Sequence, residues 1–145
     1  MSKRIEAIAA KNSNLAKKLR QSKVLHLPLY KGWFNMIAKG EKDVEYRAIT
    51  PYWLNRLYWL DREHSEEELY EVAEQAQKFG QDGLSCFEAK IKHFDYIIFS
   101  NGYKANAPIL VCECGGISID FGKEKLGAAK DVRYFCISVS PIHQQ

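Results

Sequence analysis

Apolar residues recur at helical spacing near the start of the chain. Four of them fall close to one face of a helix: Ile5, Ile8, Leu15 and Leu19. This spacing predicts one helix, or two short ones, over residues 3–21. The polar run Asn12-Ser13-Asn14 weakens the middle of this segment and marks where it would divide.

Three further helices are predicted from apolar patterns and their end signals. Residues 31–39 place Trp33 on an apolar face, and Gly40 stands where a helix commonly stops. Thr50-Pro51 is a strong helix start, with a hydroxyl N-cap and proline at the first helical position. Ser65 and Glu68 have capping-box spacing, and an apolar face follows over residues 66–79.

Alternating apolar and polar residues predict strands elsewhere. Residues 24–29 alternate before Pro28 intervenes, which indicates a short edge strand. The segments expected to form the other strands are 42–47, 94–100, 109–122 and 131–140. Within the longest segment, Gly115-Gly116 predicts a bulge or bend. Four or five strands with short helices indicate the α+β class and a small mixed β-barrel.

Composition is that of a single globular domain of 145 residues, with 46% hydrophobic and 27% charged residues. No apolar run approaches the roughly 20 residues that span a membrane, and the N-terminus lacks a signal-peptide pattern. We therefore expect a cytoplasmic protein without a membrane partner. Its four cysteines (Cys86, Cys112, Cys114 and Cys136) form no CxxC pair. We expect reduced thiols, no metal site and no cofactor.

Charge is unevenly distributed along the chain. Residues 1–23 contain seven basic residues and one acidic residue, a net charge of +6, whereas the whole chain carries +3. The remainder therefore carries −3. We interpret residues 1–23 as a basic N-terminal helical extension and residues 24–145 as the main domain. The extension either attracts phosphates electrostatically or is simply a solvated helix.

The segment GEKDVEYR at residues 40–47 has the pattern G-x-K-x-x-E-x-R. Later landmarks follow it in order: Thr50-Pro51-Tyr52-Trp53, FSNGY at residues 99–103, Pro108, Gly127-Ala128 and the last strand into Ile142. Over about residues 24–142 the chain resembles ASCH domains of the PUA-like superfamily, in particular a phage-like or bacterial subgroup. The resemblance implies a PUA-like β-barrel with a cleft beside the helix that precedes the motif.

Two functions follow from this resemblance. Family members are associated with RNA binding, which predicts an RNA- or nucleotide-binding module with a cationic cleft at the motif. Some small members hydrolyse an acylated pyrimidine nucleoside, and some are reported as ribonucleases. The alternative is therefore a small hydrolase of a modified nucleoside or RNA, with Lys42 and Glu45 catalytic. Whether the protein is an enzyme stays open here, because the hydrolytic relatives have threonine where this chain has Glu45.

The chemistry of the motif residues fits either function. Lys42 and Arg47 supply positive charge, and the planar fork of Arg47 suits bidentate contacts. Glu45 accepts hydrogen bonds or acts as a general base. A buried Lys42 would have a lowered pKa and could act as a base or nucleophile. The competing interpretation is a structural Glu45–Arg47 salt bridge with Lys42 exposed.

Aromatic residues near the motif suggest base stacking. Trp33 and Tyr103 are the expected ligand-contacting aromatics, whereas Trp53 and Trp59 are expected mainly in the core. Glu124 lies in the region where relatives carry a further acid that is proposed to act with the lysine.

Overall fold

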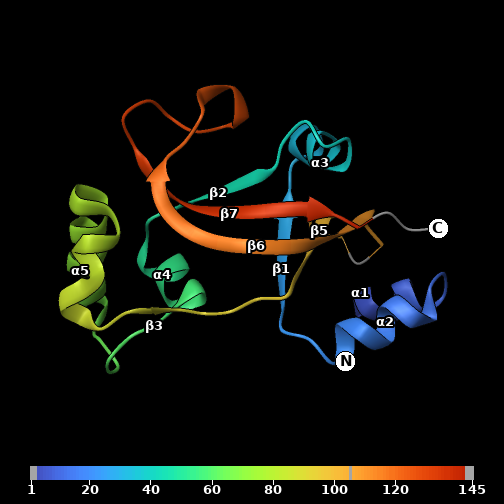
Figure 1. The fold of residues 1–145 in the computed structure, drawn as a ribbon, viewed down its shortest axis with the longest axis horizontal. Helices are drawn as coiled ribbons and strands as arrows, with labels where there is room; N and C mark the ends of the chain where they lie inside the picture. Colours follow the sequence, from blue (N-terminus) through green and yellow to red (C-terminus); the bar gives the residue numbers. More distant parts are fainter. Residues whose placement is uncertain (1–2, 105, 143–145) are drawn as a thin grey trace. The chain divides into compact units, whose positions relative to one another are not determined.

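The computed structural model describes residues 3–104 and 106–142. Its helices are α1 (Lys3–Ala9), α2 (Ser13–Arg20), α3 (Lys31–Ala38), α4 (Pro51–Leu57) and α5 (Glu66–Phe79), with 3-10 turns η1 (Gly80–Phe87) and η2 (Glu124–Leu126). Its strands are β1 (Val24–Leu29), β2 (Val44–Ala48), β3 (Tyr58–Trp59), β4 (Lys90–Ile91), β5 (Tyr96–Asn101), β6 (Ile109–Phe121) and β7 (Arg133–Pro141) (Figure 1).

Five strands form one mixed sheet in the order β1-β5-β6-β7-β2, and β3 pairs with β4 separately. β1 runs parallel to β5, while the β5–β6 and β2–β7 pairs are antiparallel. The predicted α+β class is confirmed. Of the predicted small mixed β-barrel, the structure shows a five-stranded mixed sheet whose end strands are β1 and β2. β1 stands at one end of the strand order, as Pro28 predicted. Within β6, Gly116 has φ +120°, so the strand leaves regular extended geometry at the predicted Gly-Gly position.

The chain divides into two compact units. The first comprises Met1–Asp43, His93–Gly116 and Val139–Gln145, and the second comprises Val44–Lys92 and Ile117–Ser138. This division cuts through the motif, which leaves Lys42 in the first unit and Glu45 and Arg47 in the second. β6 and β7 each contribute residues to both units.

In the first unit, both faces of the β1–β5 pair carry buried side chains. One face presents Tyr96 and Ile98 of β5, together with Val111 of the neighbouring β6, to the apolar faces of α1 and α2. The helix residues in this cluster are Ile5, Ile8, Leu15, Ala16 and Leu19. The opposite face carries residues of β1 and β5 that are also buried: Leu25, Leu27, Ile97 and Phe99. α3 packs against β5.

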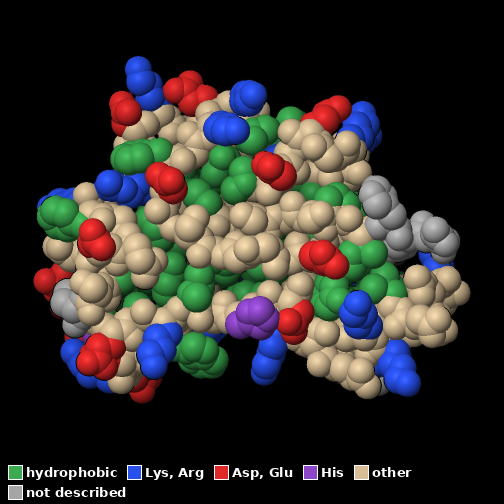
Figure 2. Space-filling view, viewed as in Figure 1, with side chains coloured by type: hydrophobic (Ala, Val, Ile, Leu, Met, Phe, Trp, Pro, Cys, Tyr) green, Lys and Arg blue, Asp and Glu red, His purple; other side chains and the backbone are tan. Residues whose placement is uncertain are grey.

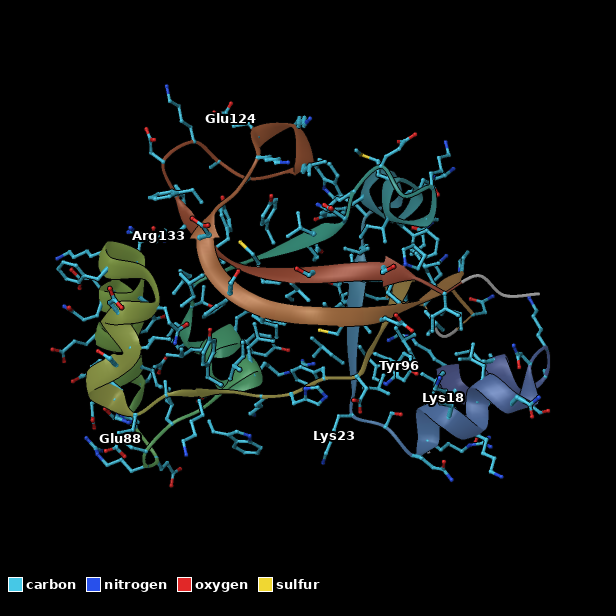
Figure 3. The ribbon with its side chains drawn as sticks, in the orientation of Figure 1. Lys18, Lys23, Glu88, Tyr96, Glu124 and Arg133 are labelled. Carbon is cyan, nitrogen blue, oxygen red and sulfur yellow. The ribbon has the colours of Figure 1, made fainter. Side chains whose placement is uncertain are left out.

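The N-terminal segment therefore folds as part of the first unit. Of the two predicted forms, the structure has two short helices, divided at Asn12. The Asn12 side chain caps α2 by accepting the N–H of Leu15 at 3.0 Å. Lysines stay on the outside, and Lys18 of α2 extends over the ring of Tyr96, with Nζ 5.7 Å from its centroid (Figure 3). The hydrogen bond to Tyr96 raises the pKa of Lys18.

In the second unit, two helix caps form at the residues predicted from the sequence. Thr50 accepts the N–H of Trp53 at the start of α4. Ser65 and Glu68 form the complete capping box of α5. At the other end of α5, Arg133 of β7 donates from Nη1 to the carbonyls of Gln77 (2.7 Å) and Lys78 (2.8 Å) (Figure 3). A cation at a helix C-terminus stabilises the helix dipole, so Arg133 ties β7 to α5.

The cysteine side chains that are described belong to free thiols: Cys112, Cys114 and Cys136. Burial raises the pKa of the Cys112 thiol to about 12, which makes it unreactive at neutral pH. Among the described residues, no cluster of three or more His, Cys, Asp or Glu side chains could hold a metal ion. No helix in the same residues combines the length and apolar character needed to cross a membrane.

The packing of α2 predicts that Leu19→Ala destabilises the protein by about 2–5 kcal/mol, because it leaves a cavity against the sheet. The matched control is Lys17→Ala, two residues away on the exposed side of the same helix. Urea unfolding followed by circular dichroism measures both. Equal midpoints for the two variants would show that the N-terminal helices do not belong to the folded core.

Candidate functional site

The end of α3 determines where Lys42 lies. Gly40 has φ +78°, and its N–H donates to the carbonyl of Ile37, while the N–H of Glu41 donates to that of Met36 (3.0 and 2.9 Å). These two bonds form a Schellman motif, which ends a helix with glycine in the left-handed region. The Lys42 N–H also reaches the Met36 carbonyl, at 3.2 Å. The chain is therefore folded back against the helix it has just left.

This turn brings Lys42 back to the side of α3. Its Nζ lies 4.3 Å from the ring centroid of Trp33, which is within the range of a cation–π contact. Lys42 is 2% exposed. The expectation that Lys42 sits at the helix-to-strand corner agrees with this geometry, since β2 begins only at Val44. The alternative of an exposed Lys42 is wrong.

Glu45 and Arg47 point to the same face of β2, as the period of a strand requires. They lie opposite Ile137 and Phe135 of β7, both fully buried, so the two charged side chains occupy an apolar face. Nη2 of Arg47 donates to Oε2 of Glu45 at 2.6 Å. The guanidinium carbon also lies 5.1 Å from the ring centroid of Trp53. The predicted salt bridge is therefore present.

Burial of charge is concentrated in the motif. Within residues 3–104 and 106–142, the charged residues that are buried are Lys42 and Glu45. The Arg47 side chain is only slightly more accessible to solvent, at 16% exposed. Taking a charge out of water costs several kcal/mol unless partners compensate. Such costs are typical of functional sites, although structural ion pairs also incur them.

The predicted aromatic residues lie in contrasting environments. Trp33 is partly buried beneath Lys42. Tyr103 is 87% exposed in the loop after β5. Trp59 was expected in the core but is largely exposed, with Lys92 Nζ 4.2 Å from its ring centroid. Glu124 is exposed on η2 (Figure 3).

Sequence reasoning missed the role of Tyr46, the residue between Glu45 and Arg47. Its hydroxyl accepts the N–H of Lys123 at 3.0 Å. Its ring packs so closely on Gly122 that a Cβ there would lie 2.8 Å from ring atoms. Tyr46 therefore anchors the segment that follows β6. The available signal was alternation, which places Tyr46 on the strand face opposite Glu45; its contact with the segment after β6 has no signal in the sequence.

Comparisons with protein-family models, curated proteins and solved structures gave no match to this chain. The resemblance to ASCH domains therefore stays a prediction, based on the motif and the landmarks that follow it.

The geometry at Gly40 predicts that Gly40→Ala destabilises the protein by about 1–2 kcal/mol. Nothing lies within 4 Å of an added Cβ, so the cost comes from the left-handed backbone alone. Gly32→Ala is the matched control, because Gly32 also has open space but lies inside α3. There alanine favours the helix, and we expect a gain of up to about 1 kcal/mol. Thermal and urea unfolding measure both variants, and destabilisation by Gly32→Ala would contradict this account.

The Glu45–Arg47 pair predicts strong coupling between the two positions. Glu45→Leu alone leaves a largely buried guanidinium without its carboxylate and should cost about 3–5 kcal/mol. The double variant Glu45→Leu/Arg47→Met removes both charges, and we expect it to be more stable than Glu45→Leu alone. A double-mutant cycle with Arg47→Met, measured by urea unfolding, gives the coupling energy. Additive effects would show that the bridge contributes nothing.

Proposed function

We propose that the protein is an RNA- or nucleotide-binding module of the ASCH type, with a PUA-like fold, and that it binds its ligand through Lys42, Glu45 and Arg47. The observation that carries this proposal is the burial of Lys42 and Glu45, two charged residues of one eight-residue motif. Among the described residues, no other Lys, Arg, Asp or Glu is buried, and buried charges cluster at functional sites. The cytoplasmic location expected from the sequence fits such a ligand and stays a prediction.

Each cation of the motif lies against an indole ring. Lys42 contacts Trp33, and Arg47 contacts Trp53. An aromatic face holds a cation without neutralising its charge, so the cation can still attract an anion. Arg47 presents a planar fork suited to phosphate oxygens, and the Glu45 carboxylate is suited to a base amino group. Phosphate and base amino groups occur together in nucleotides and RNA.

The basic N-terminal helices support the same ligand class. Exposed lysines protrude from α1 and α2, as Figure 2 shows for the face it draws. They would attract phosphates without regard to sequence. Deleting residues 1–23 is not a clean test of this role, because deletion uncovers Tyr96, Ile98 and Val111. Neutralising Lys3, Lys11 and Lys17, which are all exposed, keeps the helices in place.

A second candidate function is hydrolysis of an acylated nucleoside or of RNA. It is favoured by the burial of Lys42, since a lysine removed from water is a potential base or nucleophile. Glu45 would serve as a general base for water. Turnover of acylated nucleosides or short RNAs that is lost in a folded Lys42→Met variant would establish this function. A panel that gives no turnover at high protein concentration would exclude it for those substrates.

The binding function predicts that labelled short RNAs bind with an affinity that falls steeply as salt rises. We expect Lys42→Met to weaken binding by about tenfold or more, the effect of about 1.4 kcal/mol. The triple variant Lys3→Gln/Lys11→Gln/Lys17→Gln should reduce the salt slope, by about 0.7 for each phosphate that the variant no longer neutralises. Fluorescence anisotropy measures both effects, and Lys78→Met on the exposed face of α5 is the control.

Chemical-shift mapping with the same RNA locates the binding site independently. Shifts are expected at residues 40–47 and at Trp33. Shifts confined to other regions, salt-independent binding, or the absence of binding to every RNA would contradict the proposed function.

A further inference from the structure

Two tyrosines of the first unit are the most exposed of the large hydrophobic residues that the structure describes. Tyr30 is 84% exposed and Tyr103 is 87% exposed. They lie 73 positions apart in the sequence, yet each follows one of two paired strands: Tyr30 comes directly after β1, and Tyr103 comes two residues after β5.

The parallel register places the two tyrosines at the same end of the sheet. Leu29, the last residue of β1, is in register with Asn101, the last residue of β5. The N–H of Gly102 continues the pairing by donating to the Leu29 carbonyl at 3.0 Å. Paired strands lie about 4.8 Å apart. The segments that carry Tyr30 and Tyr103 therefore leave the sheet from adjacent strand ends.

A buried serine fixes the turn that leads to Tyr103. Ser100 is fully buried, and its hydroxyl donates to the carbonyl of Gly102 at 2.7 Å. Gly102 has φ +94°, a conformation that favours glycine. Two hydrogen bonds therefore hold Gly102, one from the Ser100 hydroxyl to its carbonyl and one from its N–H to the Leu29 carbonyl. They fix the backbone immediately before Tyr103.

Local structure does not account for tyrosine at position 30. Tyr30 is the N-cap residue of α3, where Ser, Thr, Asp and Asn are favoured, and its side chain makes no capping hydrogen bond. With most of its surface in water, its ring adds little to the core. An aromatic ring at this place therefore needs an explanation outside the stability of the fold.

Both tyrosines are followed by an exposed lysine, Lys31 after Tyr30 and Lys104 after Tyr103. No acidic residue occurs in the sequence within residues 29–40 or 100–108. Two exposed rings, each followed by a lysine in a segment without acidic residues, complement the two parts of an unpaired nucleotide chain. Rings stack on bases, and cations contact phosphates.

We propose that Tyr30 and Tyr103, here termed the tyrosine pair, stack on bases of a single-stranded oligonucleotide while Lys31 and Lys104 contact its phosphates. This inference rests on the proposed function for the class of ligand and narrows that class to unpaired strands. Bases inside a duplex are stacked on one another, and their faces are not available to the tyrosine pair.

The test is anisotropy with labelled eight-nucleotide strands of RNA and of DNA, each also offered as a duplex. Tyr30→Ala and Tyr103→Ala should each weaken single-strand binding by about tenfold, the effect of losing one stacked ring. Tyr30→Phe and Tyr103→Phe keep a ring and should stay within about twofold of the parent protein. Tyr70→Ala removes a tyrosine that is 61% exposed on α5 and should change nothing.

The outcomes separate this inference from the proposed function. Binding that Lys42→Met weakens but that Tyr30→Ala and Tyr103→Ala leave unchanged would overturn the tyrosine pair and keep the motif site. The reverse pattern would keep the tyrosine pair and overturn the motif site. Equal affinity for duplex and single strands would overturn the tyrosine pair, and binding to none of these nucleic acids would overturn both. RNA and DNA strands of the same sequence show whether the 2′-hydroxyl contributes.

Discussion

Burial of charge is the constraint on which the rest of the candidate site depends. A carboxylate on an apolar strand face must be compensated, and Glu45 receives a hydrogen bond from Arg47 at 2.6 Å. The guanidinium in turn lies against Trp53 of α4. Thr50 begins that helix with a side-chain cap, so the cap indirectly positions the ring that covers Arg47. Residues 45–53 thus supply the ion pair, the Trp53 ring that lies against it and the Thr50 cap that begins the helix carrying this ring.

The first unit provides packed support for the side chains that we propose to bind a ligand. Helices α1 and α2 cover one face of the sheet, and α3 packs against β5. β5 is buried on both faces, and a strand held in this way has little freedom to move. Residues at the carboxyl end of the β1–β5 pair, including Tyr30 and Tyr103, are therefore presented from a fixed base. Binding residues commonly lie on loops that a rigid scaffold positions in this way.

Features that depend on neighbouring residues were predictable from the sequence. The helix stop at Gly40, the cap at Thr50 and the box at Ser65 and Glu68 all appeared as expected, because each is encoded within a few residues. The shared face of Glu45 and Arg47 followed from the period of a strand. The sequence left one helix or two open for the N-terminal segment, and the structure has two, divided at the polar interruption that begins at Asn12.

Features that depend on distant parts of the chain were not predictable. The parallel pairing of β1 with β5 joins segments about 70 residues apart. The sequence of neither segment indicates which strand it pairs with. The exposure of Trp59 was missed because hydrophobicity alone indicated burial. The burial of Lys42 was left open for a different reason: it lies only nine residues from Trp33, but its return to that ring requires the geometry of a Schellman turn and not just the presence of glycine.

The Glu45–Arg47 bridge bears on which ligands suit the site. An anion that takes the fork of Arg47 must compete with a carboxylate already bound at 2.6 Å. A bare phosphate gains the guanidinium only by drawing it away from the Glu45 carboxylate, and weakening that ion pair is costly at a buried position. A nucleotide avoids this cost, because its base amino group can donate to Glu45 while its phosphate accepts from Arg47. If the proposed function holds, the salt bridge occupies the place of the ligand in the free protein, and it favours a ligand that carries both a hydrogen-bond donor and an anion.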